Sequence, residues 1–156
     1  MSVDHTITLA LPDEAQTARL AACVAARLQP GDTLLLSGPI GAGKTSFARA
    51  LIRAWCGNPV EPVPSPTFTL VQTYEMAGQT LWHCDLYRLA GPDDALELGL
   101  DEALGRDICV IEWPDRLGRI APAQALRLEW AACAQGHCLT ASVPAPWADR
   151  LGACLA

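Results

Sequence analysis

Residues 33–46 read TLLLSGPIGAGKTS and hold three signals in succession. Thr33 to Ser37 is a short apolar run, typical of a strand buried at the centre of a sheet. Gly38 to Thr45 matches the pattern GxxxxGK[ST], and Ser46 to Trp55 carries apolar residues at helical spacing. A buried strand, a glycine-rich loop and a helix in this order are typical of a phosphate-binding loop, and a glycine turn without a ligand is the alternative. The sequence therefore predicts a nucleoside triphosphate as ligand.

Each part of this loop has a chemical reason. Glycines let backbone N–H groups converge on phosphate oxygens, and the start of the following helix adds partial positive charge. Lys44 is expected to bridge the β- and γ-phosphates, and the Thr45 hydroxyl is expected to bind Mg²⁺. We therefore expect the nucleotide at Gly38, Ile40, Gly41, Ala42, Gly43, Lys44, Thr45 and Ser46.

The composition limits what else the chain does. With 156 residues, 51% of them hydrophobic, it has the size of one compact domain, which we expect to span residues 1–156. Its net charge of −6 argues against a protein that holds nucleic acid unaided. The seven cysteines form no CxxC pair, so we expect reduced thiols and a cytoplasmic location. The first residues resemble neither a signal peptide nor a membrane anchor, and we expect no membrane partner.

Apolar periodicity predicts strands and helices in alternation. We expect an α/β fold, a single P-loop NTPase-like domain whose mixed β-sheet has parallel central strands flanked by helices. The expected strands are residues 7–11, 33–37, 70–75, 80–85, 108–111, 126–132 and 138–143, with hairpins at 76–79 and around 135–136. The first expected helix opens at residues 12–14. Further helices are expected over residues 46–55, 93–98, 101–104 and 147–155, and residues 57–66 are expected to form a proline-rich loop.

A magnesium–nucleotide site also needs a carboxylate, normally at the carboxyl end of a neighbouring buried strand. Asp85 and Glu112 each end such a strand. Either residue alone fits a helix cap or a solvated strand end, but two of them beside one phosphate loop favour the metal site. Thr67, in the segment Ser65-Pro66-Thr67-Phe68, lies where switch loops occur in P-loop NTPases and is placed to reach the γ-phosphate; an ordinary Pro-Thr turn is the alternative.

The expected nucleotide is ATP. An Asn-Lys-x-Asp segment, which reads guanine in GTPases, is missing, and Lys44 is the only lysine in the chain. We therefore expect ATP with Mg²⁺.

Four segments carry a more specific pattern than the loop alone. They are SGPIGAGKTSF at 37–47, SPTFTLV at 65–71, HCDLYRL at 83–89 and IEWP at 111–114. In order and spacing they resemble the TsaE family, the bacterial P-loop ATPases of tRNA threonylcarbamoyladenosine biosynthesis. The resemblance runs from Leu11 to the last hairpin.

The resemblance implies partners and roles. TsaE-like proteins bind a complex of two related proteins, TsaD and TsaB, and their ATP binding and hydrolysis support threonylcarbamoyl transfer to adenosine 37 of tRNAs reading ANN codons. It implies that Thr45 and Glu112 hold Mg²⁺ and that Asp85 serves hydrolysis, positioning the attacking water. Lys44 and Thr67 complete the catalytic residues that we expect. Contact with tRNA is expected only indirectly through the partners, and basal turnover is expected to be low because no arginine finger is evident.

The resemblance also indicates which residues lie near the adenine base of the nucleotide. It places the tryptophan after the metal-binding glutamate beside the nucleotide, and the segment Leu11-Pro12-Asp13 on the adenine side. Family members often have Gly-Arg in the last hairpin turn, whereas this chain has Gly136-His137, and an imidazole stacks without the fixed bidentate charge of guanidinium. The residues expected on the adenine side are Pro12, Asp13, Trp113 and His137.

Other functions fit parts of the pattern. A small-molecule kinase on the same fold would use Arg116 and Arg119 as lid arginines. A nucleotide-gated adaptor would change partner affinity on binding alone, without hydrolysis. Tyr87-Arg88 and the Pro-Thr-Phe loop are candidates for a partner surface, unless they serve only packing and solvated charge.

Overall fold

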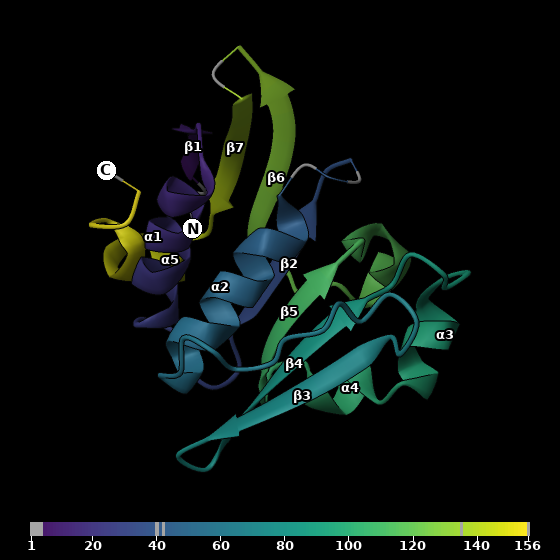
Figure 1. Ribbon diagram of the computed structural model, residues 1–156. Helices are drawn as coiled ribbons and strands as arrows, with labels where there is room; N and C mark the ends of the chain where they lie inside the picture. Colours follow the sequence, from purple (N-terminus) through teal and green to yellow (C-terminus); the bar gives the residue numbers. More distant parts are fainter. Residues whose placement is uncertain (1–4, 40, 42, 135, 156) are drawn as a thin grey trace.

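One seven-stranded mixed sheet runs through the chain (Figure 1). The structure is a computed structural model that describes residues 5–39, 41, 43–134 and 136–155. The strands lie in the order β1-β7-β6-β2-β5-β4-β3. Neighbours from β6 to β4 are parallel, and the other pairs are antiparallel, which confirms the predicted parallel centre. The strands are β1 His5–Leu11, β2 Thr33–Ser37, β3 Val71–Met76, β4 Gln79–Asp85, β5 Ile108–Glu112, β6 Leu126–Cys133 and β7 Gly136–Val143.

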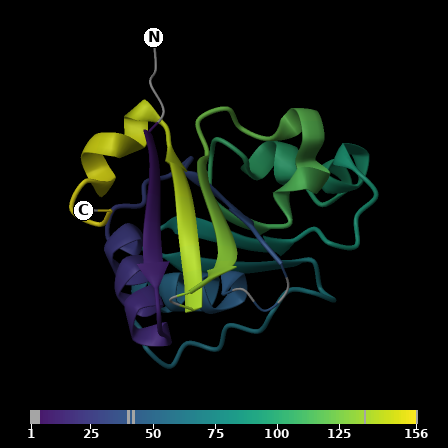
Figure 2. The same cartoon turned by 90° about the horizontal axis from the view of Figure 1, so that it is seen from above.

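Helices cover both faces of the sheet (Figures 1 and 2). They are α1 Glu14–Ala25, α2 Lys44–Cys56, α3 Pro92–Glu97, α4 Leu100–Ala103, α5 Ala145–Leu151 and the 3₁₀ helix η1 Pro114–Ile120. Helices α1 and α2 pack on one face, and α3, α4 and η1 on the other. The closing helix ends at Leu151 rather than at the predicted Leu155, and η1 was not predicted. Among the described residues, no helix has both the length and the apolar character to cross a membrane.

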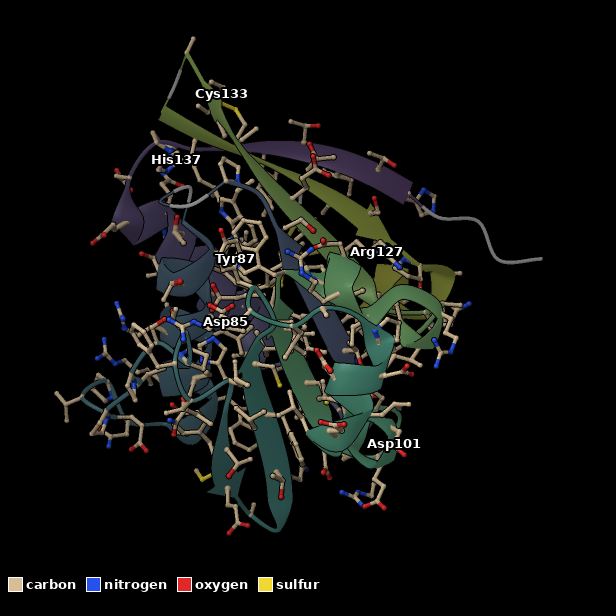
Figure 3. All side chains as sticks on the ribbon, turned by 90° about the vertical axis from the view of Figure 1, so that its right-hand side faces the viewer. Asp85, Tyr87, Asp101, Arg127, Cys133 and His137 are labelled. Carbon is tan, nitrogen blue, oxygen red and sulfur yellow. A yellow bond between two sulfur atoms is a disulfide. The ribbon has the colours of Figure 1, made fainter. Side chains whose placement is uncertain are left out.

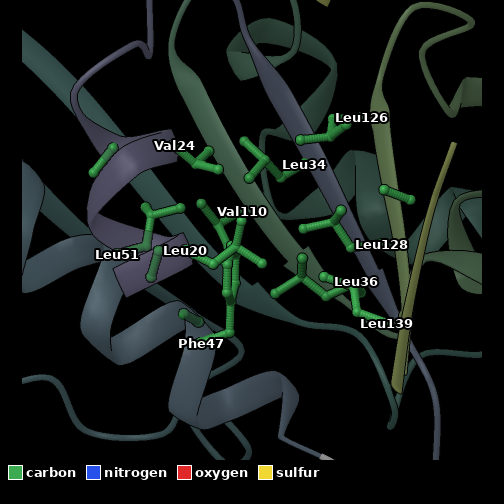
Figure 4. Close-up of a cluster of buried hydrophobic side chains, with 14 of the residues drawn as sticks. Leu20, Val24, Leu34, Leu36, Phe47, Leu51, Val110, Leu126, Leu128 and Leu139 are labelled. Carbon is green, nitrogen blue, oxygen red and sulfur yellow. The ribbon is translucent and has the colours of Figure 1, made fainter. Parts of the chain in front are cut away.

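Alternation along β2 explains the two layers. Leu34 and Leu36 point toward α1 and α2, where they meet Val24 and Phe47 (Figure 4). Leu35 points to the other face and belongs to the cluster formed with α3, α4 and η1. Because successive side chains of a strand face opposite ways, a strand buried on both faces must be apolar throughout.

Four of the seven cysteines form disulfides. Cys23 of α1 is joined to Cys154 after α5, and Cys133, labelled in Figure 3, is joined to Cys138 across the β6–β7 hairpin. The prediction that the cysteines are reduced is wrong for these four. Sequence spacing did not reveal the first pair because folding brings its members together across 131 positions. The thiols of Cys56, Cys84 and Cys109 are free, and burial raises the pKa of Cys109 to about 12.

Candidate active site

The glycine-rich loop leaves the carboxyl end of β2 and ends at the first residue of α2. Gly38 and Gly43 have φ angles of 135° and 118°, which side chains rarely tolerate. A Cβ on Gly38 would lie 2.7 Å from the carbonyl oxygen of Trp130. Gly43 is the N-cap of α2 and has no side chain to cap the helix, so the first N–H groups remain available to an anion. The predicted nucleotide residues Ile40 and Ala42 lie outside the described residues.

Lys44 is buried at the start of α2, with 5% of its surface exposed. Its Nζ donates to the carbonyl oxygen of Gly38 at 2.5 Å and lies 3.6 Å from the centre of the Trp113 ring. Within the described part of the chain, no carboxylate forms a salt bridge with it. Burial lowers the pKa of the ammonium, although the negative charge of Glu112 and Asp85 nearby opposes this. A buried cation without an ion pair, at a helix start, is suited to bind an anion.

Thr45, the second residue of α2, faces the end of β5. Its Oγ1 donates to Oε1 of Glu112 at 2.9 Å, although the two residues are 67 positions apart. The other carboxylate oxygen, Oε2, lies 2.8 Å from Nε2 of His83. Both Glu112 and His83 are buried. The hydroxyl and the carboxylate are hard oxygen donors of the kind that Mg²⁺ prefers, so this pair fits the predicted metal.

Asp85 ends β4 directly beside Glu112, because these two residues are partners in the parallel register of β4 and β5. Its Oδ2 accepts a hydrogen bond from Oγ1 of Thr67 at 3.3 Å, and its Oδ1 accepts one from the backbone N–H of Tyr87 at 3.0 Å. Ser65 Oγ lies 2.8 Å from Thr67 Oγ1. The predicted switch segment is therefore linked to the predicted catalytic carboxylate.

A cavity of about 530 Å³ joins these groups, a volume usual for small-molecule sites. Figure 3 shows two of its residues, Asp85 and Tyr87, near each other, with His137 toward the hairpin tip. The predicted residues that line it are Pro12, Asp13, Gly41, Gly43, Lys44, Thr45, Ser46, Thr67, Asp85, Glu112, Trp113 and His137.

Some predicted residues have additional or different contacts. Gly38 does not line the cavity but holds Lys44 through its carbonyl. The Asp13 carboxylate caps α1, since Oδ1 accepts from the backbone N–H of Gln16 at 2.8 Å. Arg116 bonds to Asp115 and Arg119 to Asp93, and neither lines the cavity.

Two aromatic side chains of the predicted partner surface have contacts that the sequence did not specify. Tyr87, considered only as a partner contact, lines the cavity and packs against Trp113 with ring centres 4.9 Å apart. Phe68 in the switch segment is 76% exposed and lies under the Arg88 guanidinium, 4.3 Å from ring centre to Cζ. His83, which received no role from the sequence, supports Glu112; its position two residues before Asp85 put it on the same face of the strand.

Comparison with known proteins identifies the family. Residues 11–137 match the family model described as threonylcarbamoyl adenosine biosynthesis protein TsaE. The chain belongs to the TsaE family. It is therefore a member of a family of tRNA threonylcarbamoyladenosine biosynthesis, which confirms the resemblance.

Relatives within the TsaE family cover most of this chain. The protein from Rickettsia bellii, named tRNA threonylcarbamoyladenosine biosynthesis protein TsaE, is 41% identical over 118 residues, 76% of this chain and 81% of the relative. The protein of the same name from Rickettsia felis is 45% identical over 107 residues, 69% of this chain and 62% of the relative. The crystal structure of Bacillus subtilis YdiB shares the fold, with a TM-score of 0.71 at 24% identity over 99% of this chain and 95% of that one.

Proposed function

We propose that this chain is an Mg²⁺-dependent ATPase that supports threonylcarbamoylation of adenosine 37 in tRNAs reading ANN codons, acting on a TsaD–TsaB complex as one domain over residues 1–156. One observation carries the ATPase part. Lys44 is buried without an ion pair among the described residues, and it borders a cavity that also contains the Thr45–Glu112 pair. A cation, a helix start and oxygen ligands in one cavity favour a metal-bound polyphosphate over other ligands.

Each residue at the phosphates and the metal has a role that follows from its chemistry. Lys44 exchanges its bond to Gly38 for the β- and γ-phosphates, and the start of α2 holds the phosphates through its backbone N–H groups. Thr45 and Glu112 hold the magnesium ion. Magnesium, when bound, neutralises charge on the phosphate oxygens.

Asp85 positions the attacking water. Both oxygens of its carboxylate already accept a hydrogen bond, from Thr67 and from the Tyr87 N–H, and these bonds fix its orientation. Thr67 couples this carboxylate to a loop that responds to the γ-phosphate. None of the arginines in the described ranges lines the cavity, so basal hydrolysis is slow and the partner complex completes the site.

Of the four residues expected on the adenine side, Pro12, Asp13 and His137 form the wall that we assign to the adenine, whereas Trp113, which contacts the Lys44 ammonium, is assigned to the phosphate side. Because the Asp13 carboxylate caps α1, the wall binds the adenine mainly through its shape and through stacking. Base selection for ATP therefore comes from the wall rather than from an ionic contact.

TsaD and TsaB are the proposed partners, and the acidic chain leaves tRNA contact to them. The exposed pair of Phe68, in the switch segment, and Arg88 is the proposed contact surface. A cytoplasmic location stays a prediction.

The test follows the γ-phosphate of labelled ATP in the presence of TsaD, TsaB, substrate tRNA and a threonylcarbamoyl donor. We expect release of inorganic phosphate, reduced by about a hundredfold in Asp85→Asn, whereas that variant still binds ATP. Arg119→Ala is the matched control, because its guanidinium pairs with exposed Asp93 outside the cavity.

The outcomes separate the alternatives. Label in a phosphorylated small molecule, together with a loss in Arg119→Ala, would establish a kinase instead. Full tRNA modification by Asp85→Asn without phosphate release would establish an adaptor in which binding alone suffices.

A further inference from the structure

His83 lies next to Glu112 but does not line the nucleotide cavity. It is fully buried, and its Nε2 lies 2.8 Å from Oε2 of Glu112. Asp85 and Glu112 line the cavity, but His83 does not. Any effect of His83 on a ligand must therefore pass through Glu112.

The surroundings of His83 single out this one contact. On its own strand face Leu81 precedes it, and Val110 is its partner on β5. Its Nδ1 has no hydrogen-bond partner among the described residues. A buried imidazole in an apolar layer is costly, and an aliphatic side chain would pack there without leaving a polar atom unpaired. The bond to Glu112 is the property that an aliphatic side chain cannot supply.

The position of the ring hydrogen follows from these contacts. With hydrogen on Nε2, the ring donates to the carboxylate, and only a lone pair on Nδ1 is left without a partner. With hydrogen on Nδ1, a lone pair would face the carboxylate and a buried N–H would be unpaired, which is worse on both counts. The structure therefore favours the Nε2–H form.

The two oxygens of Glu112 are thus assigned to different neighbours: Oε2 to His83 and Oε1 to Thr45. The last torsion of a glutamate is broad, so without a donor behind it the carboxylate rotates. We propose that His83 is a positioning residue that holds Oε2 and thereby directs Oε1 to the metal beside Thr45. This inference rests on the proposed function, since it needs a metal at Thr45 and Glu112.

The test measures metal affinity rather than turnover. Mn²⁺ binding to the protein with saturating ADP is followed by electron paramagnetic resonance for wild type, His83→Leu and His83→Gln. We expect the dissociation constant for Mn²⁺ to rise about 10- to 100-fold in His83→Leu, as is usual when a partner behind a metal ligand is lost. The amide nitrogen introduced by His83→Gln reaches a position similar to that of Nε2, so this variant is expected to recover most of the affinity. ADP affinity in EDTA is expected to stay within twofold of wild type in both variants.

Three results would overturn the assignment. His83→Leu binding Mn²⁺ within twofold of wild type shows that the carboxylate needs no donor, and equal losses in His83→Leu and His83→Gln show a packing role. If His83→Leu does not fold, nitrogen-15 spectra of the wild-type ring decide, since an Nε2 without hydrogen contradicts the proposal. Failure of wild type itself to bind ADP both with Mg²⁺ and in EDTA contradicts the proposed function, a result that no loss confined to the His83 variants mimics.

Discussion

The ammonium of Lys44 lies 3.6 Å from the centre of the Trp113 ring. Lys44 begins α2, whereas Trp113 directly follows β5 and has a φ of 59°, in the left-handed region. Tyr87 packs on the same indole. A phosphate that approaches Lys44 must therefore displace or share the contact with this ring.

Trp113 is expected to report nucleotide binding. Adding ATP and Mg²⁺ to wild type should change the intrinsic fluorescence, and Trp113→Phe should remove more than half of this change because the ring contacts the phosphate-binding lysine. Trp82→Phe is the control, since its indole bonds to Asp107, away from the cavity. Equal losses in the two variants would contradict the prediction.

Lys44→Met is expected to bind no nucleotide and yet to fold. Wild type at 100 times the Kd for ATP should gain about 2.7 kcal/mol, or roughly 5–10 °C in Tm at this chain length, and the variant should gain nothing. A thermal-shift assay measures both. An ATP-dependent rise in the Tm of Lys44→Met would show that the phosphates bind elsewhere.

The same variant tests the cost of the buried charge. Because burial lowers the pKa of Lys44, the folded protein disfavours the ammonium, and this penalty is fully present at any pH below the lowered pKa. As pH rises through that pKa toward the ordinary lysine value, the penalty disappears. Without nucleotide, Lys44→Met should therefore be more stable than wild type at pH 7 in urea denaturation, by a margin that shrinks toward pH 10. If the stability margin of Lys44→Met over wild type grew with pH instead, the pKa of Lys44 would be raised rather than lowered, and the prediction would be wrong.

Gly38→Ala is expected to destabilise the fold by roughly 2–3 kcal/mol. The backbone at this position has a φ that alanine tolerates poorly, and the new methyl group would lie 2.7 Å from the Trp130 carbonyl oxygen. Gly41→Ala is a matched control, because its φ is also positive but its Cβ meets nothing within 4 Å, so it should cost about 1 kcal/mol. Equal costs in urea denaturation would show that the contact with Trp130 is relieved by movement of the loop.

Thr67→Val is expected to slow hydrolysis about tenfold in the presence of TsaD and TsaB, since Asp85 loses one of its two hydrogen bonds. ATP should still raise the Tm, because the phosphate loop is unchanged. Ser65→Ala serves as the comparison: it removes the neighbour of Thr67 but leaves the bond to Asp85. A full rate in Thr67→Val would remove Thr67 from the site.

The central part of the fold was predictable because its signals are local. The run of leucines, the glycines and the helix start at Lys44 are contiguous, so no knowledge of the sheet order was needed. Asp85 and Glu112 each end an apolar run. Their place beside the phosphate loop followed from the rule that parallel strands present their carboxyl ends at one edge of the sheet.

The remaining features depend on contacts between distant segments. His83 was quoted within a motif, but its bond to Glu112 appears only once β4 lies beside β5. The Cys23–Cys154 pair depends in the same way on how the end of the chain packs near α1. The 3₁₀ helix η1 has no apolar repeat to predict it, since Pro114 and Gly118 interrupt the segment.

The burial of Lys44 has a consequence for chemical labelling. Apart from the α-amino group of the chain, its side chain is the only primary amine in the sequence. An amine-directed reagent can therefore modify one side chain alone, and that side chain lies between the Gly38 carbonyl and the Trp113 ring. The lowered pKa leaves more of it as the nucleophilic free amine than for an ordinary lysine. The rate of acylation at this single position, read by mass spectrometry, thus becomes a direct measure of how accessible the Lys44 amine is.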